Sequence, residues 1–360
     1  MRILLSILGI ILATGVIGSF FITRGGKLVT PTGAGNILIE GKSFESFPLP
    51  SYADAFLTEN YKSYLIEVEP GIKVHMLEVG EGYPIFMQHG NPTSGFLYRK
   101  VVEELPLDRV RVILPTMVGL GFSSKVPVKE HTVENHNRWL NLALAELELD
   151  GLIYVGQDWG GIVGVGALSH SPEWVEGIVI MNTAIYAPTE KMSLSRIHDL
   201  VRTPIVGELL LENIRSPFGG LDTVQGDPDS IPVAVKELYG RPVEESGNKK
   251  APLALMRMVP HSPEHPSTES MAKLIPFIRG LDVPTEIVWG MNDPITGRAL
   301  PAMREHFPTA RVTETQAGHF LQEEVPEDIA AAVMRVLDQV QNDPSGQSEQ
   351  LEDSERISDE

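Results

Sequence analysis

The chain has 360 residues, with 29 basic and 48 acidic side chains and a formal net charge of −19. Hydrophobic residues at 42% and charged residues at 21% are ordinary globular values and exclude a wholly disordered chain or a multi-span membrane protein. The acidic balance excludes a nucleic-acid partner, because binding to phosphates needs clustered Lys and Arg. The absence of cysteine excludes disulfides, thiolate metal sites and a Cys nucleophile.

The first apolar segment, residues 3–23, carries no charged side chain and lies between Arg2 and Arg24. As a helix, these 21 residues would be roughly 31 Å long, close to the roughly 30 Å hydrocarbon core of a bilayer. Residues 1–27 are therefore predicted to be a single-pass membrane anchor, with the lipid bilayer as partner. Cleavage near Ala13-Thr14-Gly15 is the alternative and would give a secreted or periplasmic protein. The flanking positive charges balance, and an extracytoplasmic catalytic part is weakly preferred.

The next part of the chain predicts a linker and then a sheet. Residues 28–43 are assigned to a linker because this stretch is rich in Gly and Thr. Tyr64–Val68 and Val74–Val79 flank the turn signal Glu69-Pro70-Gly71 and predict a hairpin. Four short apolar runs predict buried strands: Ile85–Met87, Val110–Leu114, Leu152–Val155 and Ile178–Met181. Apolar residues at helical spacing between them, as in Val133–Leu147, predict a parallel sheet with helices on both faces.

The alternation stops after the strand that ends at Met181. Residues 184–275 are rich in Pro and contain helical fragments such as Val206–Leu211, so they predict a helical cap inserted into the sheet domain. Strands return at Glu286–Trp289 and Ala310–Thr313. A last helix is predicted near Pro326–Leu337.

These elements define the expected domain organisation. The α/β core is expected to comprise residues 44–183 and 276–340, interrupted by the cap. Residues 341–360 hold seven acidic residues and one Arg and almost nothing apolar. That composition cannot bury a core, so a disordered acidic tail is predicted.

A sharp turn between a strand and a helix is the first feature that indicates chemistry. Val155 to Gly161 reads VGQDWGG, with glycines at 156 and 160 on either side of Asp158. Small residues at these positions permit a strained strand-to-helix turn that exposes the central side chain. A carboxylate there can attack carbon and form an ester. The alternative is that Asp158 is only an N-cap of the following helix.

Two more strand ends carry matching groups. Gln88 to Ser94 reads QHGNPTS and can aim backbone N–H groups at a developing negative charge, although a plain turn with Ser94 as N-cap is the alternative. His319 follows the last predicted strand, where a general base would lie in this topology. Asp293 follows the strand before it and can orient that base. The chain order is nucleophile, acid and His, as in α/β-hydrolases.

Together these motifs resemble those of the haloalkane dehalogenases, an α/β-hydrolase family. The resemblance extends from about Tyr61 to Leu337. The motifs are HGNPTS (89–94), GQDWGG (156–161), WGMNDP (289–294), AGHFLQEE (317–324) and, in the cap, TPIVGE (203–208). The resemblance implies a mostly parallel sheet flanked by helices, with an inserted helical cap.

The resemblance also implies roles for five residues. Asp158 would be the nucleophile, His319 would activate the hydrolytic water, and Asp293 would orient His319. Asn91 and Trp159 would bind the halide through side-chain N–H groups and form the oxyanion hole through backbone N–H groups. The implied reaction converts a small halogenated alkane and water to an alcohol and a halide ion through an alkyl ester on Asp158. It requires no cofactor.

The tryptophans narrow the resemblance to one subfamily. Some dehalogenases use a second Trp from the cap, but the four Trp here lie at 139, 159, 174 and 289, all outside the insertion. Asn91 is therefore expected to be the second halide ligand. Other dehalogenases with this Asn carry their acid after the strand that precedes the cap, where this chain has Met181-Asn182-Thr183. The combination of Asp, His, Asp, Asn and Trp resembles the third dehalogenase subfamily.

Two other functions stay open at this point. An epoxide hydrolase shares the nucleophile, the acid and the His, and needs two cap tyrosines, for which Tyr186 and Tyr239 are candidates. A non-catalytic, membrane-tethered binding protein with the same fold would be favoured if a member of the triad were missing. No metal site is expected, because the prolines around His261 and His265 prevent the helix that would align them. The halide preference and the natural substrate do not follow from one sequence.

Overall fold

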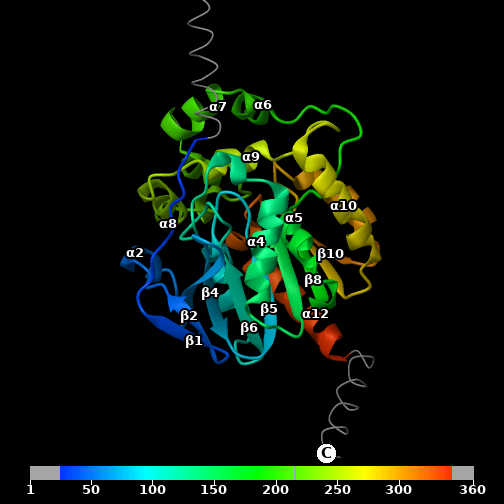
Figure 1. Cartoon of the computed structure of the whole chain (residues 1–360). Coiled ribbons are helices and arrows are strands. Elements are labelled where there is room, and N and C mark those ends of the chain that lie inside the picture. Colours follow the sequence, from blue (N-terminus) through cyan, green and yellow to red (C-terminus); the bar gives the residue numbers. More distant parts are fainter. Residues whose placement is uncertain (1–24, 215, 343–360) are drawn as a thin grey trace, which may run out of the picture.

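The computed structural model describes residues 25–214 and 216–342, and these residues form an α/β sandwich around one sheet (Figure 1). The sheet has ten strands in the order β1-β2-β3-β4-β6-β5-β7-β8-β9-β10. They are β1 (Asn36–Ile39), β2 (Lys42–Ser46), β3 (Lys62–Glu69), β4 (Ile72–Gly80), β5 (Tyr83–Gln88), β6 (Val110–Pro115), β7 (Leu152–Gln157), β8 (Val175–Met181), β9 (Thr285–Gly290) and β10 (Arg311–Thr315). Strands β5 to β10 are parallel to one another, and β1 to β4 are antiparallel.

Helices cover both faces of this sheet. The core helices are α2 (Ser51–Asp54), α3 (Arg99–Glu103), α4 (Val133–Ala145), α5 (Trp159–Leu168), α11 (Leu300–His306) and α12 (Pro326–Asn342). Helix α4 packs against α5, and α12 packs against α3, β8 and β9 behind the sheet (Figure 1). The central strands β6 and β7 are buried along their whole length, which explains their mostly apolar sequences. The predicted α/β-hydrolase fold, a mostly parallel sheet flanked by helices, is confirmed.

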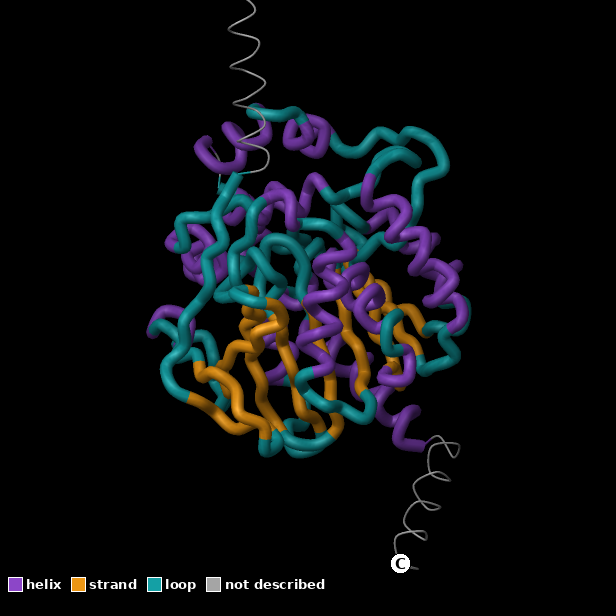
Figure 2. Tube along the Cα trace, in the orientation of Figure 1, coloured by secondary structure: helices purple, strands orange, loops and turns teal. Residues whose placement is uncertain are grey.

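The cap is inserted between β8 and β9. Its helices are α6 (Arg196–Arg202), α7 (Val206–Glu208), α8 (Val233–Glu245), α9 (Ala251–Arg257) and α10 (Pro266–Gly280), with short helical turns η4 (Leu209–Ile214), η5 (Pro217–Val224) and η6 (Pro228–Ser230). Figure 2 shows the part of the cap with α6, α7 and α9 above one end of the strands, whereas α10 extends down the side of the molecule and contacts α4 and α5. Helix α10 continues past the predicted cap boundary at residue 275. Since β8 leads directly into this insertion, the cap lies over the carboxyl ends of the parallel strands.

The N-terminal part of the described chain differs from the predicted linker at 28–43. Strands β1 and β2 form a hairpin that extends the antiparallel side of the sheet through β3. Before the hairpin, Val29 pairs antiparallel with Lys125, and Lys27 accepts a hydrogen bond from Asn248 of the cap. Part of the predicted linker is therefore sheet, and the stretch before it is fixed to both core and cap.

The predicted membrane location requires correction. Over residues 25–214 and 216–342, no helix has the length and apolar character needed to cross a bilayer. The predicted anchor at 3–23 lies outside the described residues, as do positions 343–360 of the predicted acidic tail. The membrane prediction, with the bilayer as partner, is therefore wrong for the part of the chain that the structure describes, and β1 and β2 occupy part of the span assigned to its linker.

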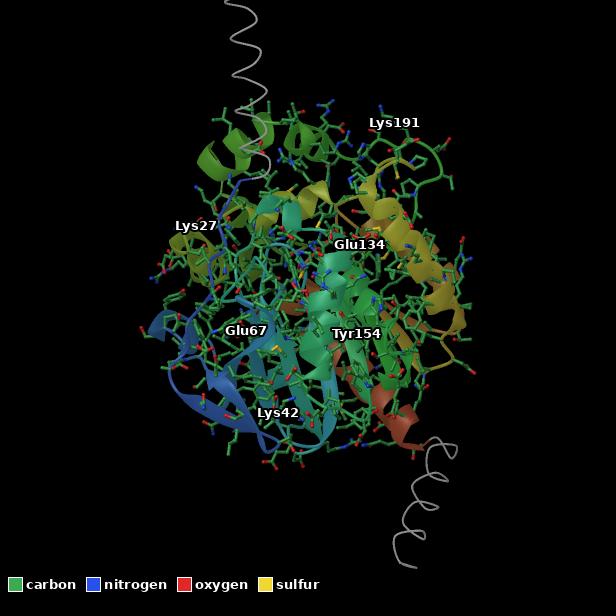
Figure 3. All side chains as sticks on the ribbon, viewed as in Figure 1. Lys27, Lys42, Glu67, Glu134, Tyr154 and Lys191 are labelled. Carbon is green, nitrogen blue, oxygen red and sulfur yellow. The ribbon has the colours of Figure 1, made fainter. Side chains whose placement is uncertain are left out.

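The contact between β7 and α5 fixes the position of the predicted strand-to-helix turn at Asp158. Tyr154 lies on β7 in the middle of the molecule (Figure 3), and its hydroxyl donates to the Gly160 carbonyl at 2.7 Å. A Cβ atom on Gly164 would lie 1.6 Å from the Tyr154 hydroxyl oxygen, and one on Gly160 would lie 2.1 Å from the Gln88 carbonyl oxygen. Only glycine lets α5 come this close to β5 and β7. The N-terminus of α5 is thereby fixed at the strand ends.

Candidate active site

Asp158 lies at the turn between β7 and α5. Its φ of +53° is in the left-handed region, which costs energy for a residue with a side chain. Its N–H donates to the Asn182 carbonyl at 3.0 Å, and its own carbonyl accepts from the Thr183 hydroxyl at 2.7 Å. Asp158 occupies the N-cap position of α5 but makes no capping hydrogen bond. The turn instead projects the carboxylate beyond the strand, where 16% of the side chain stays exposed.

The two carboxylate oxygens of Asp158 have different surroundings. Oδ1 accepts the backbone N–H of Asn91 at 2.8 Å, and the backbone N–H of Trp159 also bonds the carboxylate. Oδ2 lies 3.6 Å from Nε2 of His319. A Cβ on Gly90 would lie 2.3 Å from Oδ1, so this approach requires glycine. Burial raises the pKa of Asp158, although the His319 ring and the two N–H groups oppose that rise.

His319 and Asp293 meet on the other side of this carboxylate. Nδ1 of His319 lies 3.0 Å from Oδ2 of Asp293. Asp293 also accepts the N–H of Ile295 at 2.7 Å and the hydroxyl of Thr296 at 2.5 Å. Burial alone would raise the pKa of Asp293, but the His319 ring and these hydrogen bonds lower it to about 2. Burial opposes the charge on His319, yet the carboxylates of Asp293 and Asp158 raise its pKa above 6.5.

Asn182 is a functional candidate that the sequence analysis missed. Its Nδ2 donates to Oδ2 of Asp293 at 2.8 Å and to the carbonyls of Gly290 and Gly318 at 3.2 and 3.3 Å. Its Oδ1 accepts the N–H of Gly290 at 2.8 Å. Asn182 thereby joins the ends of β8 and β9 to the loop that carries His319. Its place at the end of a strand could have indicated a role, but the sequence analysis considered this place only as one that lacks a carboxylate.

Asn91 and Trp159 lie beside the Asp158 carboxylate with polar groups to spare. Nδ2 of Asn91 donates one hydrogen to the Pro252 carbonyl of the cap at 3.2 Å, which leaves its second hydrogen. Oδ1 of Asn91 is buried without a protein partner. Trp159 is 4% exposed, and its indole N–H can only donate. These N–H groups can therefore hold an anion next to Asp158.

The two cap tyrosines of the epoxide hydrolase alternative are occupied elsewhere. The hydroxyl of Tyr239 donates to Glu323 at 2.8 Å and accepts from Arg99 at 3.3 Å. The hydroxyl of Tyr186 donates to the Pro260 carbonyl at 2.9 Å. Neither hydroxyl is directed at the Asp158 carboxylate, so this alternative loses the proton donors that it requires.

The His, Asp and Glu side chains of the described residues do not gather into a metal site. No group of three or more His, Asp or Glu side chains within residues 25–214 and 216–342 could hold a metal ion. His261 lies in a loop, and His265 caps α10 by accepting the N–H of Ser267. The polar groups around Asp158 are therefore those of an acid, a base and N–H donors.

Similarity to known proteins shows the family to which the chain belongs. A model described as the alpha/beta hydrolase fold matches residues 83–202. A cis-3-alkyl-4-alkyloxetan-2-one decarboxylase of Xanthomonas campestris is 30% identical over 290 residues, which are 76% of this chain and 95% of the relative. Haloalkane dehalogenase 2 of Mycobacterium tuberculosis is 28% identical over 272 residues, 73% of this chain and 90% of the relative. The structure of the haloalkane dehalogenase DatA from Agrobacterium tumefaciens has a TM-score of 0.68 and 26% identity, covering 81% of this chain and 100% of its own.

Proposed function

The chain belongs to the α/β-hydrolase family and is similar to its haloalkane dehalogenases, and from that premise we propose that it hydrolyses haloalkanes through an ester on Asp158. One observation carries the proposal: the Asp158 carboxylate accepts the backbone N–H groups of Asn91 and Trp159, two residues that also carry side-chain donors, and lies 3.6 Å from the ring of His319, which is paired with Asp293. We further propose the arrangement of the third subfamily, with Asn91 and Trp159 as halide ligands and Asp293 as the acid.

The first step is attack on carbon. Oδ1 of Asp158 accepts the backbone N–H of Asn91, and Oδ2, on the side of His319, attacks the carbon that bears the halogen. The carbon–halogen bond breaks as the ester bond forms, and the halide leaves as an anion. The indole N–H of Trp159 and the remaining amide hydrogen of Asn91 bind that anion without protonating it. Such donors act most strongly where water is excluded.

The second step is hydrolysis of the ester. Neutral His319 accepts a proton from water as the water attacks the Asp158 carbonyl carbon, and Asp293 stabilises the imidazolium. The negative charge develops on Oδ1, which already accepts the backbone N–H of Asn91, and the backbone N–H of Trp159 bonds the same carboxylate. Collapse releases the alcohol and restores the carboxylate. Because His319 is needed only for this step, the two steps can be separated by mutation.

The test uses the full chain and 1,2-dibromoethane. Wild type should release bromide continuously, and Asp158→Asn should release none. His319→Ala should release about one bromide per site and then stop, with an alkyl adduct detectable by mass. A wild-type protein that forms no bromide, or a His319→Ala variant with full turnover, would contradict the proposed roles. A non-catalytic binding protein would likewise form none.

A second candidate reaction follows from the relative with 30% identity, which is named as an oxetanone decarboxylase. Asp158 could open a four-membered lactone by attacking the saturated ring carbon that is bound to the ring oxygen. A carboxylate then takes the place of the halide as leaving anion. Loss of carbon dioxide from that adduct gives an alkene and frees Asp158, and no water is consumed. A cis-3,4-dialkyl oxetan-2-one tests this candidate, with the alkene as product. His319→Ala should keep this activity while losing dehalogenase turnover, because only the hydrolysis requires an activated water.

A further inference from the structure

The loop that carries His319 is bound to the cap at consecutive backbone N–H groups. The N–H of His319 donates to the carbonyl of Val224 at 2.8 Å. The N–H of Phe320 donates to Oε1 of Gln225 at 2.9 Å, and the carbonyl of Phe320 accepts from Nε2 of Gln225 at 3.1 Å. The buried amide of Gln225 therefore binds both backbone groups of Phe320, as a neighbouring strand would.

Glu324 extends this attachment. Its Oε1 accepts the N–H of Gly318 at 2.9 Å and the N–H of Gly226 at 3.1 Å, and its Oε2 accepts the N–H of Asp227 at 2.8 Å. One carboxylate thus bonds the residue before His319 and two residues of the cap. The backbone N–H groups of residues 318, 319 and 320 therefore all donate either to the cap or to the Glu324 carboxylate, which itself bonds the cap.

Close backbone contact between the two segments requires glycine on both sides. A Cβ on Gly318 would lie 2.4 Å from the Cα of Gln225, and a Cβ on Gly226 would lie 2.3 Å from the Gln316 carbonyl oxygen. The two segments therefore fit in one arrangement only, and a shift of the cap segment moves the His319 backbone with it. Residues 224–227 of the cap therefore help to hold His319, the proposed base, in place.

We propose that Gln225 and Glu324 are positioning residues for His319, and that the cap segment 224–227 sets the place from which His319 activates water. The inference rests on the proposed two-step hydrolysis. Neither side chain touches the Asp158 carboxylate, so both act through the loop. Their loss should slow ester hydrolysis and spare ester formation, because only hydrolysis uses His319.

The test is Gln225→Met in the full chain, which keeps the side-chain length and removes both hydrogen-bonding groups. Rapid-quench mass measurements with 1,2-dibromoethane give the rates of ester formation and ester decay separately. We expect a full bromide burst and ester decay slowed about 10- to 100-fold, because small displacements of a catalytic group have effects of that size. An unchanged decay rate, or equal loss in both steps, would overturn the inference.

A second variant and a control keep the result decisive. Glu324→Gln keeps the size of the side chain but turns one acceptor oxygen into an NH₂ donor, which cannot accept the N–H groups that the carboxylate binds. It should slow ester decay in the same direction, and an unchanged decay rate in this variant would also overturn the inference. Tyr239→Phe removes a cap–core hydrogen bond to Glu323 and leaves the partners of the backbone N–H groups of residues 318–320 in place. It should leave the ratio of the two rates unchanged, and a ratio shifted as far as in Gln225→Met would overturn the inference.

Failure of the proposed function would be recognised separately. If wild type forms no bromide, dehalogenation is rejected, and amide hydrogen exchange then judges the cap attachment. Exchange at His319 and Phe320 should be faster in Gln225→Met than in wild type, while exchange in the middle of β7 stays unchanged. Equal exchange at 319 and 320 would overturn the inference whatever the substrate is.

Discussion

The base side and the leaving-group side of the site are built differently. On the base side, Asp293 has four types of donor, and Asn182 and Glu324 bind the surrounding backbone. On the leaving-group side, Asn91 has one amide hydrogen beyond the one that it donates to Pro252, and Trp159 carries an indole N–H. Many hydrogen bonds within the protein hold the Asp293 side chain in one orientation, whereas a side-chain donor without a protein partner can bind an anion. The difference separates positioning from binding, and the expected effects of mutation differ accordingly.

The largest effect is expected from Asp293→Asn on the base side. Replacing the acid in an Asp–His pair misorients the imidazole and favours the wrong tautomer, at a cost of about 10⁴-fold in turnover. Ester hydrolysis should fall by about that factor while the first bromide burst remains, and the alkyl adduct should persist by mass. Asp282→Asn, on an exposed loop residue, is the control. Loss of the burst would mean that Asp293 serves both sides.

The leaving-group side is tested by Trp159→Phe. This change removes the indole N–H and keeps the backbone N–H that bonds Asp158. Ester formation should slow about 100-fold, the usual effect of removing one donor from an anion site, while decay of a preformed ester changes little. Stopped-flow bromide release measures the first step, with Trp174→Phe on the protein surface layer as the matched control. Equal slowing of both steps would remove the distinction between the two sides.

Asn182→Asp sharpens the role of the base-side network in stability. It places a second carboxylate 2.8 Å from Asp293 and removes the donor to two carbonyls. The free energy of unfolding at pH 7 should fall by about 2 kcal/mol, the range for a lost buried hydrogen bond. The deficit should shrink as pH falls, because protonation of one carboxyl restores a donor. Urea unfolding against an Asn36→Asp control at an exposed position measures it; a deficit independent of pH would contradict the like-charge explanation.

The smallest effect concerns pH. In the free protein the carboxylates of Asp293 and Asp158 raise the pKa of His319 above 6.5 against the effect of burial. Activity is lost as pH falls through this pKa, since protonated His319 cannot accept a proton. In the ester the charge on Asp158 is gone, so ester decay should titrate at a lower pH than His319 in the free protein. NMR titration of the ring and the pH profile of ester decay compare the two, and coincident values would contradict the coupling.

Much of the fold followed from local sequence. Buried strands such as β5 and β7 were predictable because apolar side chains cover both of their faces. The hairpin of β1 and β2 was not, because it forms the edge of the sheet and lacks a clear strand pattern: Leu38 is 68% exposed, and β2 reads KSFES with one apolar residue. The apolar run at 3–23 was predicted to be a membrane anchor from its length and its lack of charged side chains.

The candidate site divides in the same way. Asp158, Asp293 and His319 were brought together correctly because the carboxyl ends of parallel strands meet at one edge of the sheet; their catalytic roles stay proposals. Gln225 could not be paired with Phe320, since 95 residues separate them and the path of the cap over the core is not encoded by any local period. Asn182 was visible in the sequence, but its value depends on three carbonyl and carboxylate oxygens that only the folded chain assembles.

The contact of Tyr154 with Gly164 has a consequence for mutational tolerance. The hydroxyl of Tyr154 occupies the space that a methyl group on residue 164 would need. Any larger residue there would push α5 away from β7 and carry the N–H of Trp159 away from the Asp158 carboxylate. Libraries that aim to broaden substrate range can therefore vary exposed cap positions such as Leu200 and Leu209 freely. One added carbon at the buried face of α5, in contrast, would displace the N–H group that bonds the Asp158 carboxylate and so lower activity, although the substitution lies outside the active site.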